Sequence, residues 1–342
     1  MIMGKSGTPR VSVSITAYNH APFIAKAIDS VLMQRTDFEF EILIGEDDST
    51  DGTRDIVKSY ANNHPDKIRL FLNNRQDVIF IDGRPTGVRN LVNNLKNAKG
   101  EFIALLDGDD YWLNPNKLQK QVDYLDMNLY CSMVFHPVLI SQVSEGKTIS
   151  ELRNPINKEF YDLNELLIYL RFIHTSSVVM RNWIHEGIPD WFKKTPISDW
   201  SIYVIAANYG LIGSINETMS VYRMHDSGTH TSQTAYRRIS DVVSTYQILQ
   251  ENLESKYEPS IQKAIIHQSD YALQKANQSL KKNDIHESKR LFLLALRLDP
   301  KLIFKLMNNN YKVLVVYMLV FILGQQAIRP IRYYRENHYR GN

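Results

Sequence analysis

The chain has 342 residues, of which 44% are hydrophobic and 23% are charged, and its formal net charge at pH 7 is +3. This composition excludes a disordered, collagen-like or disulfide-rich protein, and the small net charge gives no reason to expect nucleic acid as a partner. The single cysteine, Cys131, excludes an internal disulfide and a cysteine-based zinc site. Residues 1–10 lack the apolar core of a secretory signal peptide, so we expect a cytoplasmic protein.

The first hundred residues alternate between strand and helix patterns. Val11–Ala17, Phe40–Gly45 and Lys67–Phe71 have the pattern of strands. Each is followed by apolar residues at helical spacing, the last of these at positions 91–95. The order β-α-β-α-β-α-β predicts an α/β fold with a mostly parallel sheet and right-handed crossovers.

The stretch Phe102–Trp112 contains the strand on which the predicted site depends. An apolar strand runs directly into Asp107, Asp109 and Asp110. Ligands bind at the carboxyl edge of open α/β sheets, where three close carboxylates would repel one another unless a cation neutralised them. Oxygen ligands of this kind suit Mg²⁺ or Mn²⁺. The alternative is an acidic turn in which Gly108 makes the bend.

Four blocks in the first third of the chain together resemble the family 2 glycosyltransferases. The blocks are Val13–Asn19, Ile44–Thr53, Arg89–Asn90 and Lys99–Asp110. The resemblance implies a GT-A-type, Rossmann-like sheet flanked by helices, a nucleotide-sugar donor, a divalent metal and inversion at the anomeric carbon. It also implies a catalytic domain over 1–230, with a nucleotide half at about 1–112 and an acceptor half at about 113–230.

By this resemblance, a set of residues near the strand ends contacts the nucleotide and the donor. The set is Thr16, Ala17, Tyr18, Asn19, Glu46, Asp47, Arg89, Asp107 and Gly108. Asp47 is expected at the base or ribose, because a carboxylate accepts strongly from N–H and O–H groups. Glu46 departs from the family pattern, which usually has aspartate there. Arg89 is a candidate for the diphosphate, with a surface ion pair as the alternative.

The resemblance also assigns catalytic and metal-binding roles. Asp109 is the candidate metal ligand, and His225 is a candidate for the metal or the diphosphate, with a structural histidine as its alternative. Asp199, before an apolar helix, is the candidate base that deprotonates the acceptor hydroxyl, and the alternative is an ordinary helix-start aspartate. Weaker candidates for acceptor or sugar contacts are Asp110, Trp112, His174, Trp200 and Arg223. Strands are expected at Ser132–His136 and Ser176–Met180.

The last hundred residues have helical patterns. A helical region over 231–300 contains one hairpin that resembles a tetratricopeptide unit, Ala272–Pro300, and is a candidate for homodimerisation. Residues 301–342 combine an apolar run, Val313–Leu323, with a basic tail that is rich in tyrosine. The run is too short to span a membrane, so residues 313–342 are expected to bind a membrane surface, such as the inner face of the plasma membrane. The alternative is a helix packed on the protein.

The expected reaction is transfer of a sugar from a nucleoside-diphosphate sugar, UDP by family habit, to a hydroxyl of a glycan or lipid-linked acceptor. The chain lacks the Gln-x-x-Arg-Trp pattern of processive synthases, so we expect one sugar per reaction. Two alternatives remain at this point. One is a catalytically silent carbohydrate- or protein-binding module on the same fold, and the other is a sugar nucleotidyltransferase, against which the lack of a glycine- and lysine-rich phosphate loop speaks.

Overall fold

The computed structural model describes residues 7–144, 147–153, 157–169, 173–225, 228, 233–309 and 311–323. The chain forms two compact units, Met1–Thr231 and Ser232–Asn342. The first unit holds the strands, and the second consists of helices among its described residues.

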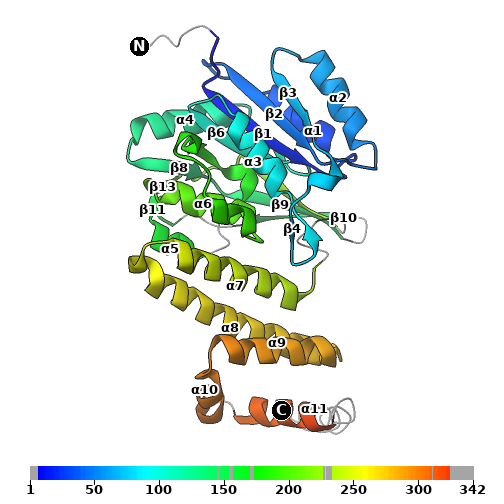
Figure 1. The fold of residues 1–342 in the computed structure, drawn as a ribbon, viewed down its shortest axis with the longest axis vertical. Coiled ribbons are helices and arrows are strands. Elements are labelled where there is room, and N and C mark those ends of the chain that lie inside the picture. The colour runs from blue at the N-terminus through cyan, green and yellow to red at the C-terminus, as the bar shows by residue number, and fades with distance from the viewer. Residues whose placement is uncertain are drawn as a thin grey trace. The chain divides into compact units, whose positions relative to one another are not determined.

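The first unit is built around an eight-stranded sheet in the order β11-β13-β8-β12-β6-β1-β2-β3 (Figure 1). Its strands are β1 (Val11–Ala17), β2 (Phe40–Glu46), β3 (Ile68–Leu72), β6 (Phe102–Asp107), β8 (Cys131–Phe135), β11 (Phe160–Tyr161), β12 (Val179–Arg181) and β13 (Leu211–Ser214). β1 pairs in parallel with β2 and β6, and β2 with β3, whereas β12 is antiparallel to both of its neighbours. The predicted α/β class with a mostly parallel sheet is confirmed.

The two faces of this sheet differ in chemistry because β1 alternates apolar and hydroxyl side chains. Val11, Val13 and Ile15 are fully buried in a core with α1 (Ile24–Leu32) and α4 (Lys117–Met127). On the other face, α3 (Val88–Asn97) docks through amides. Asn94 Nδ2 donates to Ser14 Oγ at 3.1 Å and to two strand carbonyls, while Asn90 Nδ2 donates to the Gly45 carbonyl at 2.8 Å. A Cβ on Gly45 would lie 1.6 Å from Asn90 Oδ1, so this approach needs glycine.

A second sheet, in the order β10-β9-β14-β7, completes the first unit together with a two-stranded hairpin, β4-β5. The bounds of the strands in these two sheets and of the remaining α-helices of the first unit are α2 (Thr53–Asn63), β4 (Phe80–Ile81), β5 (Arg84–Pro85), β7 (Tyr111–Trp112), β9 (Val138–Ser144), β10 (Lys147–Arg153), α5 (Leu163–Ile168), α6 (Ser198–Ala207) and β14 (Ser220–Met224). The strand expected at Ser176–Met180 is wrong in its first part, because Thr175–Ser177 forms a 3₁₀ turn and the strand begins at Val179.

Lys117, at the start of α4, is fully buried. Its Nζ lies 4.1 Å from the centroid of the Trp112 ring and accepts or donates no hydrogen bond within the described part of the chain. Burial holds the pKa of this amine well below its usual range. The surroundings of Lys117 therefore disfavour the charged form of its amine.

The second unit contains α7 (Ala235–Asn252), α8 (Glu258–Lys281), α9 (Ile285–Leu298), α10 (Leu302–Asn309) and α11 (Tyr311–Leu323). α8 and α9 pack on each other around a turn at Asn283, which has a positive φ of 66°. The Ser269 and Ser288 hydroxyls close this pair by donating to carbonyls of the opposite helix at 2.8 Å. None of the helices in the described ranges has the length and apolar character needed to cross a bilayer. The tetratricopeptide-like interpretation and homodimerisation stay predictions.

Candidate active site

The ends of three neighbouring strands meet at one edge of the large sheet. Thr16 of β1 pairs with Asp107 of β6, and Ala17 pairs with Glu46 of β2. The chain beyond each outer strand is tied back to β1, since Gly108 N donates to the Thr16 carbonyl at 2.9 Å and Asp47 N donates to the Ala17 carbonyl at 3.1 Å. The acidic segments after β2 and β6 therefore flank the end of β1 at the carboxyl edge, where ligands bind in open α/β sheets.

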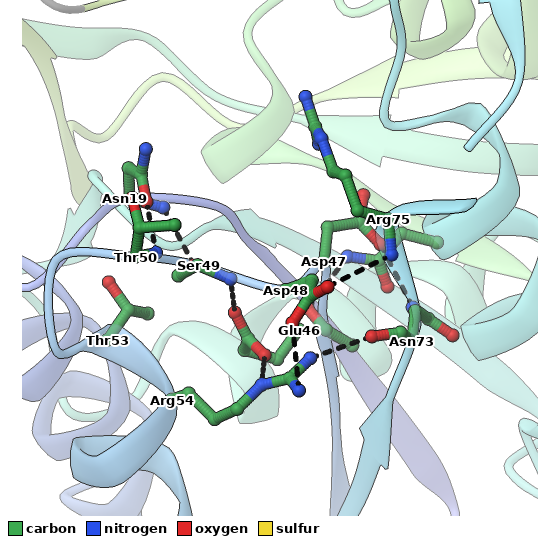
Figure 2. A network of polar contacts seen from close by, with 12 residues as sticks. Asn19, Glu46, Asp47, Asp48, Ser49, Thr50, Thr53, Arg54, Asn73 and Arg75 are labelled. Atoms are coloured by element: carbon green, nitrogen blue, oxygen red, sulfur yellow. Dashed lines mark hydrogen bonds and ion pairs between the residues drawn. The ribbon is translucent and has the colours of Figure 1, made fainter. Parts of the chain in front are cut away.

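Asp47 is the carboxylate on the β2 side, and it is 4% exposed. Asn73 Nδ2 donates to its Oδ1 at 3.0 Å (Figure 2). Burial, only partly offset by Asn73 and Arg75, raises the pKa of Asp47 to about 6. The Arg75 guanidinium carbon lies 4.0 Å from the centroid of the exposed Tyr18 ring. An aromatic face, a guanidinium and a carboxylate thus lie together, the groups that recognise a planar base.

Glu46, by contrast, is engaged on both of its carboxylate oxygens. The Arg54 guanidinium pairs with Oε2, and Ser49 N donates to Oε1 at 2.7 Å (Figure 2). Arg54 also binds Asp48 Oδ1 at 3.0 Å and the Asn73 carbonyl at 2.7 Å. This buried ion pair supports the loop that carries Asp47, and a direct donor contact by Glu46 stays a prediction.

Asn19 joins the loop after β1 to the loop after β2. Its N–H donates to Ser49 Oγ and its Oδ1 accepts from Thr50 N, both at 2.9 Å (Figure 2). Asn19 has a positive φ of 53°, a conformation that asparagine tolerates better than most residues. These contacts fix the backbone at Ala17 and Tyr18, where a nucleotide base is expected.

Arg89 lies at the start of α3 and is paired within the protein. Its NH1 is 3.0 Å from Asp77 Oδ2 and donates to the Asp77 carbonyl at 2.8 Å. The surface ion pair, which the sequence left as an alternative, is therefore present. Arg89 also contributes to the charge around Asp47. Its contact with a diphosphate stays a prediction.

Asp107 is the first carboxylate of the acidic turn. Thr16 Oγ1 donates to its Oδ1 at 3.1 Å, and the Thr175 side chain is also within hydrogen-bonding reach. Burial and the neighbouring charges of Asp109 and Asp199 raise the pKa of Asp107 to about 7. Asp199 of α6 is therefore electrostatically coupled to the end of β6, although 92 residues of sequence separate the two.

Asp109 faces two imidazoles. Its Oδ2 lies 3.0 Å from His225 Nε2 and 3.7 Å from His20 Nε2. These contacts outweigh burial, so the pKa of Asp109 is lowered. Gly108 is needed here because a Cβ would lie 2.8 Å from His20 Nδ1 and 3.0 Å from the Thr16 carbonyl oxygen. The turn thus combines one anion held ionised with a second, Asp107, that titrates near neutrality.

Asp110 is buried, and its Oδ1 accepts from Arg223 N at 2.9 Å. Its Oδ2 is buried without a hydrogen-bond partner in the described part of the chain. Burial and the charges of Asp109 and Asp107 raise its pKa well above the usual range. The Arg223 guanidinium donates to the Asp109 carbonyl at 2.7 Å, so β14 holds the acidic turn through both backbone and side chain.

Asp199 reaches the site from the first turn of α6. Its Oδ1 accepts from Trp200 N at 2.8 Å, and Thr175 lies within hydrogen-bonding reach of Asp199, Asp107 and the Tyr203 hydroxyl. Burial raises the pKa of Asp199. The carboxylate is therefore a stronger base than one in water, placed beside the acidic turn.

The remaining weak candidates occupy different surroundings. Trp112 is 1% exposed, donates from Nε1 to the Ser176 carbonyl at 3.0 Å and offers no free ring face, so the packing alternative describes it. Trp200 is likewise buried in α6. His174 contacts the Tyr222 ring at a centroid distance of 5.0 Å. Acceptor or sugar contacts by these three residues stay predictions.

The acidic turn fits a divalent cation that shares its coordination with a ligand. Asp109 and His225 are adjacent, and the unsatisfied Asp110 Oδ2 leaves a buried acceptor behind them. The described residues contain no group of three His, Cys, Asp or Glu side chains arranged to hold a metal. Mg²⁺ is commonly bound by one or two protein carboxylates together with substrate phosphates and water, and Asp109 offers one such carboxylate.

The fold and the site define a Rossmann-like α/β protein with a carboxylate-lined sheet edge. The model of glycosyl transferase family 2 matches residues 12–187, about half of the chain. An uncharacterized protein of Mycobacterium tuberculosis is 37% identical over 231 residues, which cover 67% of this chain and 63% of that protein. An uncharacterized glycosyltransferase of Nostoc is 30% identical over 234 residues, 65% of this chain and 67% of that protein. The chain belongs to glycosyl transferase family 2, and it spans less than two thirds of the length of the mycobacterial relative.

A solved structure is similar in fold. The Pyrobaculum calidifontis mannosyltransferase PcManGT, in complex with GDP-mannose and Mn²⁺, superposes with a TM-score of 0.52 at 18% identity and covers 86% of this chain and 87% of that chain. This likeness agrees with the GT-A-type fold that the sequence predicted.

Three residues of the site were missed by the sequence analysis: His20, Asn73 and Arg75. His20 is next to the predicted site residue Asn19, so a search of the flanking positions would have found it. Asn73 and Arg75 lie in a polar loop after β3 that carries no motif, and only the fold brings them to Asp47.

Proposed function

We propose that the chain transfers a sugar from a nucleoside-diphosphate sugar to a hydroxyl of a glycan or lipid-linked acceptor, one sugar per reaction and with inversion. The observation that supports this proposal is that Asp199, in the acceptor half, and Asp107, at the end of β6, share the Thr175 side chain as a neighbour. The proposed base would then lie beside the carboxylates expected to hold the donor. Such a pairing is needed for a direct displacement, in which base and leaving group lie on opposite sides of the anomeric carbon.

The donor is proposed to bind along the ends of β2, β1 and β6. Tyr18 and Arg75 would hold the base, with Asp47 accepting its N–H groups, and the contact of the Arg75 guanidinium with the Tyr18 ring supports this. A uracil has one such N–H, and UDP is our expected nucleotide by family habit. Thr16, Ala17, Asn19, Gly108 and Asp107 then follow the donor toward the acidic turn.

In the proposed reaction, Asp199 accepts the proton of the acceptor hydroxyl while that oxygen attacks the anomeric carbon. The bond between this carbon and the diphosphate oxygen breaks, and the diphosphate leaves with both electrons. Asp109 and His225 would hold Mn²⁺ or Mg²⁺, which offsets the charge that develops on the leaving diphosphate. Arg223 holds the acidic turn in place by its bonds to Asp109 and Asp110.

The decisive experiment compares Asp199→Asn and Asp109→Asn with Asp66→Asn, an exposed carboxylate on the surface of the same unit. Nucleotide sugars would be screened by release of the nucleoside diphosphate and by protection against heat. We expect Asp199→Asn to keep donor binding and lose at least about 10²-fold in turnover, since general-base catalysis contributes about that much. Asp109→Asn should lose metal-dependent turnover, and Asp66→Asn should change neither.

The two alternatives give different results. A silent binding module would retain ligand binding in all three variants and release no nucleoside diphosphate with any donor. A sugar nucleotidyltransferase would release pyrophosphate from a nucleoside triphosphate and a sugar phosphate. Either result would overturn the proposed transfer reaction.

A further inference from the structure

α11 is apolar on all sides, and among its residues with described side chains some pack on the protein while others are exposed. It contains a single charged residue, Lys312. On its inner side, Tyr317 is buried and its ring stacks on Phe292 of α9 at a centroid distance of 3.9 Å. On the other side, Val315 and Met318 are 46% and 53% exposed. A helix that is hydrophobic all round is ordinarily enclosed by protein or by lipid.

α10 shows the same imbalance. Leu302 and Leu306 are buried, whereas Ile303, Phe304 and Met307 face solvent. The exposed positions 303, 304 and 307 share one side of the helix. We refer to α10 and α11 as the apolar helices. Scattered exposed hydrophobic residues are normal on proteins, but two consecutive helices that each expose large apolar side chains indicate an interaction surface.

The length of α11 restricts what can cover it. Thirteen helical residues extend for about 20 Å, which is shorter than the roughly 30 Å of a bilayer's hydrocarbon core. The described helix, Tyr311–Leu323, is therefore too short to cross a bilayer. It is long enough to lie in the plane of the headgroups with its exposed side against the acyl chains, as interfacial helices do.

The charges near the apolar helices select among the partners that could cover them. Neither helix contains an acidic residue, and Lys312 is exposed. The sequence that follows, 324–342, lies outside the described residues and contains four arginines, Arg329, Arg332, Arg335 and Arg340, against one acidic residue, Glu336. A second copy of this chain would bring like charges together, whereas an anionic lipid surface would neutralise them.

We propose that the apolar helices dock this protein on the surface of an anionic bilayer, with α11 lying in the interface. This surface does not depend on the transfer reaction. If the proposed acceptor is lipid-linked, the same surface would bring the enzyme to it.

The test measures co-sedimentation of the full chain with vesicles of phosphatidylcholine alone or mixed with phosphatidylglycerol. We expect binding to the mixed vesicles, and weaker binding to phosphatidylcholine alone or in about 1 M salt, where charges are screened within a few ångströms. Val315→Ser combined with Met318→Gln should reduce binding by about tenfold or more. The matched control, Met127→Gln with Leu129→Ser, removes apolar side chains of the first unit that are even more exposed and should change nothing.

Circular dichroism would check that each variant is folded, and donor binding would check the first unit separately. No binding of the wild-type chain to mixed vesicles would overturn the proposal, as would equal loss in the control variant. If Val315→Ser/Met318→Gln instead converts a dimer to a monomer in sedimentation equilibrium without affecting vesicle binding, the surface is an interface between copies of this chain. If the wild-type chain binds vesicles but transfers no sugar, only the proposed function is contradicted.

Discussion

Arg54 and Arg75 both contact Asp48, in the loop after β2, but their guanidinium groups have different surroundings. Arg54 neutralises Glu46, whose side chain is fully buried, while Arg75 lies over the exposed ring of Tyr18. Removing one partner of a buried ion pair leaves an uncompensated charge, which is far more costly than losing a contact at the surface. The side chains of one short loop system therefore divide between supporting the fold and facing a ligand (Figure 2).

The first prediction uses these arginines as a matched pair. Arg54→Met should lower the free energy of unfolding by about 3 kcal/mol, because Glu46 is left buried and unpaired. Arg75→Met should change stability by less than about 0.5 kcal/mol but weaken nucleotide binding by about tenfold, the value of a cation–π contact and a charge near the ligand. Urea unfolding and nucleotide titration measure the two effects. Equal destabilisation by both substitutions would contradict the assignment of Arg54 to the fold and Arg75 to the ligand.

The second prediction concerns the pH dependence of nucleotide binding. The pKa of Asp47 is raised to about 6, so its neutral form favours folding and this contribution is lost as pH rises through about 6. The carboxylate that accepts base N–H groups is the ionised form. Affinity for the nucleotide should therefore fall by about tenfold between pH 7 and pH 5, and level off above pH 7. Calorimetric titration across this range is the measurement, and Asp47→Asn should bind weakly with no such slope.

Among the elements, α3 shows what sequence patterns can and cannot reveal. Its apolar positions predicted a helix that returns to the sheet, and the structure has that helix. The same pattern gave no sign that Asn90 and Asn94 anchor it. A buried side-chain amide is stable only where it can donate to carbonyl groups. The carbonyls that accept from Asn90 and Asn94 belong to strands about 45 to 80 residues away in sequence. Gly45 belongs to a recognised motif, but its close approach to Asn90 needs the folded sheet to be seen.

The third prediction tests this anchor. Asn94→Ala removes bonds to Ser14 and to two strand carbonyls, and should lower the free energy of unfolding by about 2 kcal/mol. Asn94→Asp should be worse, because a carboxylate would face those carbonyl oxygens. Asn97→Ala, on the same helix, loses only local bonds to Asn93 and should cost less than about 0.5 kcal/mol. Chemical denaturation of the three variants gives the comparison, and a neutral Asn94→Asp would show that the anchor contributes little.

How well each site residue could be predicted depends on whether its own segment of sequence carries the information. Asp107 and Asp109 follow a buried strand, so their place at the sheet edge came from local pattern and topology. Asp199 required a resemblance, because nothing in its own segment distinguishes a base from a helix-start residue. Trp112 could not be resolved by sequence, since an aromatic after an acidic turn can face a ligand or the core, and here it is buried.

At the scale of the whole molecule, the described residues include one large hydrophobic core in each unit. One is formed by the strands of the large sheet with α1 and α4, and the other by α7, α9, α10 and α11 with two alanines of α8. A protein with two cores of this kind departs from simple two-state unfolding, because each core can be disrupted by itself. Activity and the proposed membrane surface would then depend on different parts of the same chain.

The fourth prediction follows from these two cores. Phe292→Ala removes the ring that stacks on Tyr317 and should destabilise the second unit by about 3 to 5 kcal/mol, the usual cost of deleting a buried aromatic ring. Nucleotide affinity should stay unchanged because the nucleotide residues belong to the first core. Differential scanning calorimetry with and without nucleotide would resolve the two transitions. A parallel loss of nucleotide binding would show that the units fold as one.

Lys117 has a consequence for alkaline solutions. Burial lowers the pKa of its amine in the folded chain, so the amine binds a proton more tightly when the chain opens. Between the folded and unfolded pKa values, unfolding therefore consumes hydrogen ions. As the solution becomes more basic, up to the ordinary lysine value, that uptake becomes harder and the native state gains resistance to denaturants. Replacement by methionine, which fills similar space without a titrating nitrogen, should abolish this gain and raise the unfolding midpoint at neutral pH. The denaturant midpoints of the wild type and of Lys117→Met would be measured between about pH 7 and 10. If both midpoints change with pH to the same extent, the Lys117 amine keeps its proton in the folded state.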